Sequence, residues 1–271
     1  MNREAWICVL AMLVLSGATI AQTPESRASG VAPATTSGSK ASAARVATKP
    51  DSGATSAQLD DEVQGSLLDK GMQSVQQGNS SEAVDIADQV IAHYESKYSD
   101  AKTRWYVARS TQESLLYLVS ATVGAEKGRD QRNATVVTSV AWPDAYYLKA
   151  YALVEMGDLD HGKVPLERAL ALMPRNSQYL SELGNIYQAD KNWPKAMQDY
   201  TDAEATSEFS YPHVKLRDKT RAKRGIAFVL VELGKLDEAE KQYRECLALD
   251  PNDSHSPQEL EYIRLLRLEK K

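Results

Sequence analysis

Residues 179–205, YLSELGNIYQADKNWPKAMQDYTDAEA, carry small and apolar side chains at intervals of three or four residues. Such intervals place the side chains along one face of an α-helix. The polar stretch ADKN interrupts the pattern. Trp193-Pro194 then puts a proline in the first turn of a second helix, where its missing N–H costs little. The segment therefore predicts two packed helices, whose backbones can approach closely at the small residues Gly184, Ala196 and Ala203.

The same pattern occurs three times, in residues 143–176, 177–210 and 220–253. The first two copies start 34 residues apart, and the third is displaced by about nine residues inserted near 208–219. Gly157 and Gly234 mark the turn between the helices of their copies. Pro174 and Pro251 mark the end of the second helix, and Pro165 predicts that the second helix of the first copy starts late.

This arrangement resembles the tetratricopeptide repeat, whose period is 34 residues. The resemblance rests on LGNIY…A…Y..A in the middle copy and LGKLDEAEKQYRECLALDPND in the last. It implies an all-α fold, a right-handed solenoid of helix-turn-helix repeats. It also implies a degenerate repeat at 62–95 within an N-terminal helical region at 59–142. A capping helix at 256–271 is expected to close the last face of the solenoid with Leu260, Ile263, Leu265 and Leu266.

The N-terminal residues predict export. Arg3 precedes an apolar core at 7–15, and small residues follow at 16–18 and 21, which is the layout of a signal peptide at 1–21. Cleavage after Ala18 or Ala21 would make the protein periplasmic or secreted, with no other segment apolar enough to span a membrane. An uncleaved anchor is the alternative. Residues 22–58 are rich in Ala, Ser, Thr and Pro and lack aromatic residues, so we expect a disordered linker there.

Residues 101–142 are less regular than the repeats. The segment RWYVA at 104–108 fits either a helix or a short strand, and ATVVTSV at 134–140 fits either a strand or a buried connector. Between them, Ser110 and Glu113 have the spacing of a capping box at the start of a helix from about 111 to 123.

Composition and motifs argue against several classes of function. A net charge of -5 and a pI of about 5.5 argue against binding to nucleic acid or to an anionic membrane. His93, His161, His213 and His255 lack metal-ligand spacing, and neither G-x-S-x-G nor a phosphate-binding motif occurs. Ser37 and Lys40 match S-x-x-K, but they lie in the expected linker, where we interpret the match as chance. Signal cleavage would leave Cys246 as the one cysteine, which we expect to be buried. We therefore predict no catalytic residues, no metal and no cofactor.

The resemblance also implies where a partner would bind. In the tetratricopeptide fold, the first helix of each repeat lines a concave groove that takes an extended peptide or a helix. The groove positions expected here are Asp144, Tyr147, Tyr151 and Val154, then Gln178, Ser181, Asn185 and Gln188, then Arg221, Arg224, Phe228 and Val231. The candidate binding residues among them are Tyr147, Tyr151, Asn185, Gln188, Arg221, Arg224 and Phe228.

Near the last repeat the expected groove is basic, whereas the whole chain has a net charge of -5. The segment KLRDKTRAKR at 215–224 carries six positive charges against one aspartate. Arginine binds carboxylates through paired hydrogen bonds. Our hypothesis is that Arg221, Arg224 and Asn185 hold an acidic group or a C-terminal carboxylate, while the aromatic residues hold apolar side chains. The alternative is a solvated basic helix start beside ordinary aromatic packing.

These observations favour a non-catalytic adaptor or scaffold of the periplasm or cell envelope that binds a protein or peptide partner. An alternative from another class is an accessory protein or enzyme that acts on cell-wall material through residues 101–142. A third possibility is self-association through exposed repeat ends. The sequence does not set the oligomeric state or name the partner, because a fold alone does not determine function.

Overall fold

The computed structural model describes residues 56–128, 130 and 132–269. The predicted signal peptide and residues 22–55 of the predicted linker lie outside the described residues. Residues 61–271 form one compact unit, to which the following description applies. The elements in chain order are α2 (Ser56–Gln76), α3 (Ser80–Lys97), β1 (Thr103–Val107), α4 (Thr111–Glu126), β2 (Asn133–Val137), α5 (Ala141–Glu155), α6 (Leu159–Leu172), α7 (Ser177–Ala189), α8 (Trp193–Thr206), the short 3-10 helix η1 (Ser207–Phe209), α9 (Pro212–Glu232), α10 (Leu236–Leu249) and α11 (Ser256–Glu269).

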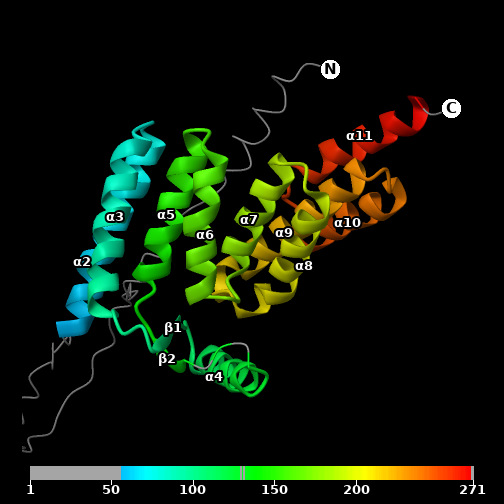
Figure 1. The fold of residues 1–271 in the computed structure, drawn as a ribbon. Helices are drawn as coiled ribbons and strands as arrows, with labels where there is room; N and C mark the ends of the chain where they lie inside the picture. The colour runs from blue at the N-terminus through cyan, green and yellow to red at the C-terminus, as the bar shows by residue number, and fades with distance from the viewer. Residues whose placement is uncertain (1–55, 129, 131, 270–271) are drawn as a thin grey trace, which may run out of the picture. The chain divides into compact units, whose positions relative to one another are not determined.

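The helices form hairpins that stack one after another (Figure 1). One hairpin is α2 with α3, joined by a hydrogen bond from the Tyr94 hydroxyl to Asp61. The others are α5 with α6, α7 with α8, and α9 with α10, and α11 packs on the last of them. The first hairpin contacts the second through α3 and α5. The all-α solenoid predicted from the sequence is thus confirmed. No helix in the described part of the chain is both long and apolar enough to cross a membrane.

The turns inside the hairpins require a left-handed backbone. Gly78, Gly157 and Gly234 adopt it with φ of 81°, 81° and 73°, whereas the turn between α7 and α8 uses Lys191 with φ of 55°. A residue with a side chain in this region costs roughly 1–2 kcal/mol relative to the right-handed helix. The turn is nevertheless closed by a hydrogen bond of 2.8 Å from Asn192 N to the carbonyl of Tyr187. Packing of the two helices therefore imposes the turn at Lys191.

Close contact between hairpins depends on Tyr200 and two glycines. Tyr200 is 1% exposed. A Cβ atom added to Gly184 on α7 would lie 2.8 Å from the Tyr200 ring, and one added to Gly225 on α9 would lie 2.4 Å from it. Both distances are shorter than any ordinary carbon contact, so the ring fits because both positions lack a side chain. The spacing of glycine and alanine seen in the sequence therefore brings α7, α8 and α9 together.

Pro165 does not delay the second helix of the first repeat, which corrects our expectation. Helix α6 begins at Leu159, with the side chain of Asp158 accepting a hydrogen bond from His161 N, and Pro165 lies inside it. A proline at this place leaves the carbonyl four residues earlier without its helical donor. That residue is His161, which is exposed, so water can satisfy the carbonyl.

The insertion before the third repeat is also mostly helical. Helix α9 begins at Pro212 rather than near Thr220, so most of the inserted residues lengthen its N-terminal end. Pro212 lies in the first turn, where a proline is well tolerated.

The capping helix α11 contacts α10, and only part of its expected apolar set is covered. Ile263 is 1% exposed and packs in the core, whereas Leu265 is 46% exposed. Leu265 is two residues from Ile263 and therefore points to a different side of the helix.

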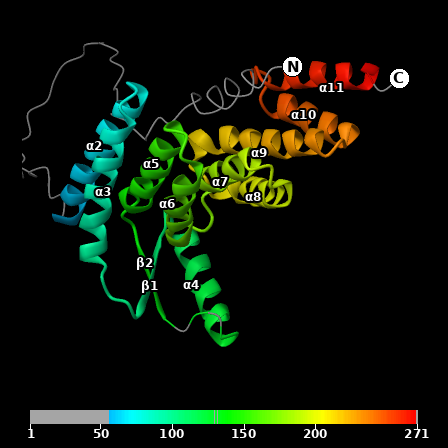
Figure 2. The same ribbon diagram turned by 45° about the horizontal axis from the view of Figure 1, so that its top comes forward.

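The irregular region folds as a strand-helix-strand unit, which settles both alternatives left by the sequence (Figure 2). RWYV at 104–107 belongs to β1 and ATVV at 134–137 belongs to β2, and the strands pair in parallel with Thr103 opposite Asn133 and Val107 opposite Val137. Parallel strands need a crossover between them, and α4 supplies it. Tyr106, Ala108 and Tyr117 form the core between the helix and the sheet, with Ala134 and Val136 packed against them.

Candidate functional site

A stack of three tyrosine rings lies where α5 meets α7. The Tyr147 ring stacks on Tyr151 with centroids 6.1 Å apart and on Tyr179 with centroids 5.5 Å apart. Tyr147 is buried and Tyr151 is half-buried. Burial raises the pKa of both phenols above the usual range, so they are neutral at physiological pH. The structure therefore places Tyr151 as the accessible end of an aromatic platform.

Glu182 on α7 is the centre of the polar contacts beside this stack. Its Oε1 accepts a hydrogen bond of 2.7 Å from Arg221 Nη1 on α9, and its Oε2 accepts one of 2.9 Å from Asn185 Nδ2. The Arg221 and Glu182 side chains are mostly buried. Burial acts to lower the pKa of Arg221, but the neighbouring charges, that of Glu182 first, and the hydrogen bond to Glu182 together outweigh it, and the pKa of Arg221 is raised. Two predicted groove residues, Asn185 and Arg221, thus meet on a carboxylate that we did not predict.

Tyr200 orients the amides of the middle repeat. Its hydroxyl lies 2.6 Å from Asn185 Oδ1 and 2.8 Å from Gln188 Oε1. Both amide oxygens face this hydroxyl, and Asn185 directs its NH2 group to Glu182. The hydroxyl has one proton and donates to one of these oxygens at a time, so Asn185, which also contacts Glu182, is the amide whose orientation is held by two contacts.

Arg224 does not join Arg221. Arg224 Nη1 donates a hydrogen bond of 2.6 Å to Asp253 Oδ1, and Asp253 is buried between α10 and α11. Arg224 is therefore not placed with Arg221 and Asn185, so the three residues do not meet around one carboxylate as we had expected. Arg221 and Arg224 are three residues apart on α9, and each faces a different neighbouring element. Phe228 lies two turns beyond Arg221 on the same face, with its ring 6.5 Å from that of Trp193.

A half-buried carboxyl group lies at the other end of the tyrosine stack. The hydroxyl of Tyr179 donates a short hydrogen bond to Asp144 Oδ1. Burial raises the pKa of Asp144 to about 6, although the Tyr179 hydrogen bond and the charge of Arg109 act in the opposite direction. Asp144 was an expected groove position. It instead joins α5 to α7.

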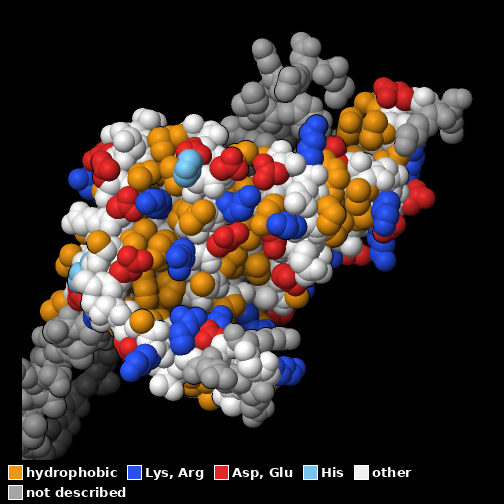
Figure 3. Space-filling view, viewed as in Figure 1, with side chains coloured by type: hydrophobic (Ala, Val, Ile, Leu, Met, Phe, Trp, Pro, Cys, Tyr) orange, Lys and Arg blue, Asp and Glu red, His pale blue; other side chains and the backbone are white. Residues whose placement is uncertain are grey.

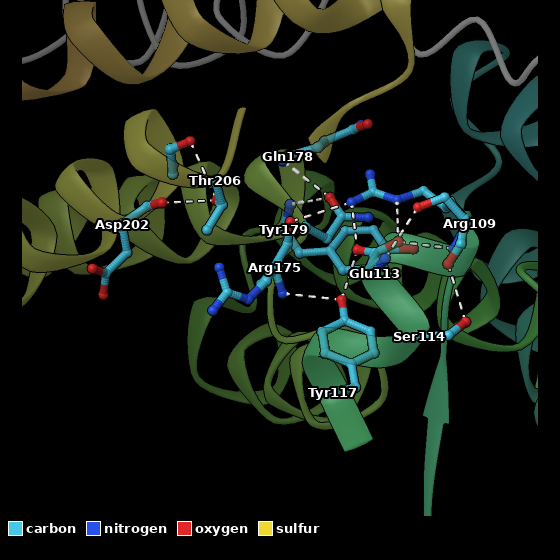
Figure 4. A network of polar contacts seen from close by, with 12 residues as sticks. Arg109, Glu113, Ser114, Tyr117, Arg175, Gln178, Tyr179, Asp202 and Thr206 are labelled. Carbon is cyan, nitrogen blue, oxygen red and sulfur yellow. Dashed lines mark hydrogen bonds and ion pairs between the residues drawn. The ribbon is translucent and has the colours of Figure 1, made fainter. Parts of the chain in front are cut away.

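An ion pair between Arg109 and Glu113 lies where the strand-helix-strand unit meets the repeats (Figure 4). Arg109 Nη2 and Glu113 Oε1 are 2.8 Å apart, with side chains 8% and 1% exposed. Glu113 also accepts hydrogen bonds from Arg109 N and from the hydroxyl of Tyr117. Arg109 Nη2 donates to the carbonyl of Arg175, in the turn between α6 and α7. The network therefore attaches α4 to the repeats.

The predicted capping box at the start of α4 is half formed. Ser110 Oγ accepts a hydrogen bond from Glu113 N at 3.2 Å, as expected for a capping residue. The Glu113 carboxylate accepts from Arg109 N instead of from Ser110 N. Burial acts to raise the pKa of Glu113, but its contacts with Arg109 lower it below the usual range, so the group is ionised.

The described residues include no group of three or more His, Cys, Asp or Glu side chains that could hold a metal ion. Cys246 is free and buried, and burial raises the pKa of its thiol to about 11. The thiol is therefore protonated and shielded at neutral pH. On the face seen in Figure 3, acidic and basic side chains are interspersed with hydrophobic ones and do not form one large basic patch.

Comparison with known proteins agrees with this fold. Residues 143–176 and 221–253 each match the tetratricopeptide repeat family. A structure from a functional characterization of Pseudomonas aeruginosa pilF resembles the chain with a TM-score of 0.52 and 15% sequence identity, covering 77% of this chain and 71% of that one. A Podosopora anserina putative kinesin light chain with nearly identical TPR-like repeats has a TM-score of 0.50 and 14% identity, covering 77% and 88%. No curated protein sequence matches the chain.

The chain therefore contains tetratricopeptide repeats in an all-α, tetratricopeptide-like fold. Proteins with these repeats generally mediate protein–protein interaction, and the repeats are typically non-catalytic scaffolds.

The raised pKa of Asp144 predicts a pH dependence of stability. The folded state binds a proton at Asp144 near pH 6, whereas the unfolded chain binds it near the usual value of about 3.9. This group therefore adds stability as the pH falls from about 7 toward 4. We expect the wild type to gain about 1–2 kcal/mol more than Asp144→Asn between pH 7.5 and 5, as measured by urea unfolding. Equal gains in both proteins would contradict the assignment to Asp144.

Proposed function

We propose that this protein is an adaptor or scaffold of the periplasm or cell envelope that binds a segment of a partner protein along α5, α7 and α9. The observation that supports the proposal most is the juxtaposition of an aromatic platform and a charged pair on these three first helices. Tyr147 and Tyr151 supply the platform, and Glu182 and Arg221 supply the pair. Aromatic residues and arginine are the residue types that most often dominate the energy of protein interfaces.

The position of Arg221 is our reason for expecting an acidic group in the partner. A guanidinium has five N–H donors in a planar fork, and the contact with Glu182 uses Nη1. Donors therefore remain for a partner carboxylate, from an acidic side chain or from a C-terminus. Glu182 keeps the guanidinium in place before the partner arrives. Gln188 and Phe228 would contact the partner on either side, and Tyr151 would contact an apolar side chain next to the acidic one.

The test needs a variant that changes the groove without breaking its ion pair. Arg221→Glu alone would place two carboxylates against each other. The exchanged double variant, Glu182→Arg with Arg221→Glu, keeps an opposite-charge pair and reverses its direction. A matched control is the same exchange in the exposed pair of α11, Glu261→Arg with Arg264→Glu. All three proteins would be used to capture proteins from an extract of the exporting compartment, with mass spectrometry as the readout.

We expect a partner that the wild type and the α11 variant retain and the groove variant loses. Circular dichroism would confirm that the groove variant is folded. Identical sets of captured proteins from all three would overturn the groove proposal. Cell-wall material retained equally by all three would favour the alternative function, in which residues 101–142 act on the envelope.

The predicted export and signal cleavage can be tested separately from partner binding. N-terminal sequencing of the protein recovered from the periplasm or the medium should begin at Thr19 or Gln22. These starts correspond to cleavage after Ala18 and Ala21. Recovery with an intact N-terminus in the cytosolic fraction would overturn this part of the proposal.

A further inference from the structure

Tyr151 on α5 has three charged side chains close to its hydroxyl group. Burial raises the pKa of this phenol, and the charges of Glu155 and Glu182 raise it further. The charge of Arg221 acts in the opposite direction. Glu182 and Arg221 form an ion pair with each other at 2.7 Å. Among the described residues, no lysine, arginine or histidine forms an ion pair with Glu155, so its charge is left without a partner.

Glu155 lies at a place that favours a positive charge. It is exposed, and it is the last residue of α5, whose last turn contains no basic residue. The C-terminal end of a helix carries a partial negative charge, which also favours a cation. Burial and the charge of Glu182 both raise the pKa of Glu155, as expected for a carboxylate that no cation compensates.

The ring of Tyr151 adds a third attraction for a cation. Tyr151 and Glu155 are four residues apart on α5, so their side chains lie on the same face of the helix. The ring is half-buried, so part of it faces solvent. A lysine or arginine side chain is attracted to the face of an aromatic ring. A carboxylate, a helix end and an aromatic ring therefore meet at one edge of the groove.

The charges around Arg221 show why an acidic group alone would be held poorly. Glu155 and Glu182 supply two negative charges near Tyr151, and Arg221 supplies one positive charge. Asp218 also acts on Arg221, but Asp218 has its own ion pair with Arg217 at 3.4 Å. The site is thus negative by one charge before any partner binds. An acidic group at Arg221 adds a second negative charge, which a basic group at Glu155 would offset.

We propose that the partner segment carries a basic residue close to its acidic one, and that the basic side chain binds between Glu155 and the ring of Tyr151 while the acidic group binds Arg221. This inference rests on the proposed function and narrows its partner to a segment with two neighbouring opposite charges. Both sites lie beside one tyrosine. Because an extended chain advances about 3.3 Å per residue, we expect the two charges within about three residues of each other. Glu155 is then a residue that determines specificity.

The first experiment uses a phage-displayed library of random dodecapeptides as the probe. Selection on the wild type should enrich peptides in which Lys or Arg lies within three residues of Asp or Glu. Glu155→Gln should keep the acidic preference and lose the basic one, and Glu155→Lys should select a second acidic residue instead. The matched control is Glu167→Gln, the same change at an exposed glutamate of α6, the second helix of the same repeat. It should select as the wild type does.

The second experiment measures the affinity of one selected peptide by fluorescence anisotropy. Replacing its basic residue by glutamine should weaken binding to the wild type about fivefold or more. Glu155→Gln should bind the two peptides equally. Glu155→Lys should prefer a third peptide, in which glutamate replaces the basic residue. This reversal distinguishes recognition by Glu155 from a structural role, because a misfolded variant would bind all three peptides weakly.

The failure of this inference can be told apart from the failure of the groove proposal. Acidic peptides without a basic preference would overturn the inference alone, as would a basic preference that Glu155→Gln retains. Selected peptides that still bind after the exchange of Glu182 and Arg221 would overturn the groove proposal and the inference together. A library from which the wild type enriches no peptide would do the same.

Discussion

Replacing Glu113 by alanine should lower the free energy of unfolding by about 3–5 kcal/mol, the range measured when one partner of a buried ion pair is removed. Glu113 is 1% exposed and accepts hydrogen bonds from Arg109 N, from the Arg109 guanidinium and from Tyr117. Without it, the Arg109 guanidinium keeps its charge in a buried place with one carbonyl contact, at Arg175. The measurement is urea unfolding followed by far-UV circular dichroism at pH 7.5.

Two variants make this result specific. Glu113→Gln keeps the size and some of the hydrogen bonds of the side chain but removes its charge, so its loss should be intermediate. Glu261→Ala removes one partner of an exposed ion pair on α11 and should leave unfolding unchanged. If Glu113→Ala unfolded at the same urea concentration as Glu261→Ala, the ion pair would not be what attaches α4 to the repeats.

The second large effect is expected at Tyr200. Tyr200→Ala should destabilise the protein by about 3–5 kcal/mol, as truncation of a buried aromatic side chain usually does. The ring is in contact with both Gly184 and Gly225, so its removal leaves a cavity between three helices. The variant should also weaken partner binding, because Asn185 and Gln188 lose the hydroxyl whose proton one of them accepts. Thermal and urea unfolding measure the first effect.

Tyr200→Phe separates packing from orientation. It keeps the ring and removes the hydroxyl, so we expect a loss of about 1 kcal/mol. Both amides are half-buried and can turn to water. Reduced partner binding by this variant with nearly normal stability would assign an orienting role to the hydroxyl. A Tyr200→Ala protein as stable as the wild type would show that the ring is not packed between the glycines.

The sequence predicted the helices best where local pattern and packing agree. Gly184, Ala196 and Ala203 revealed the hairpin because close approach of two helices excludes larger residues. Lys191 could not be recognised as a turn residue, since its left-handed backbone is imposed by the helices on either side. RWYVA could not be assigned either. A five-residue segment is too short to show a clear period, and its strand partner is thirty residues later in the chain.

The candidate site was predicted in part. Tyr147, Tyr151, Asn185 and Arg221 lie on adjoining first helices, but Arg224 turns to Asp253. Pattern alone places a residue on a face of a helix and does not say which neighbour its side chain reaches. Glu182 was missed, although it is the one charged residue of α7 and lies one position after an expected groove residue. A lone carboxylate on an otherwise neutral helix was the signal that could have found it.

The contact between Arg109 and Arg175 has a consequence for the order in which the chain is made. Repeats of a solenoid mostly contact their neighbours, so each can fold soon after synthesis. Arg109 leaves the ribosome 66 residues before the carbonyl that it binds. At a synthesis rate of roughly 5–20 residues per second, this interval lasts several seconds. Until then the strand-helix-strand unit lacks its hydrogen bond to the turn between α6 and α7, so this attachment forms only after the first repeat has been made.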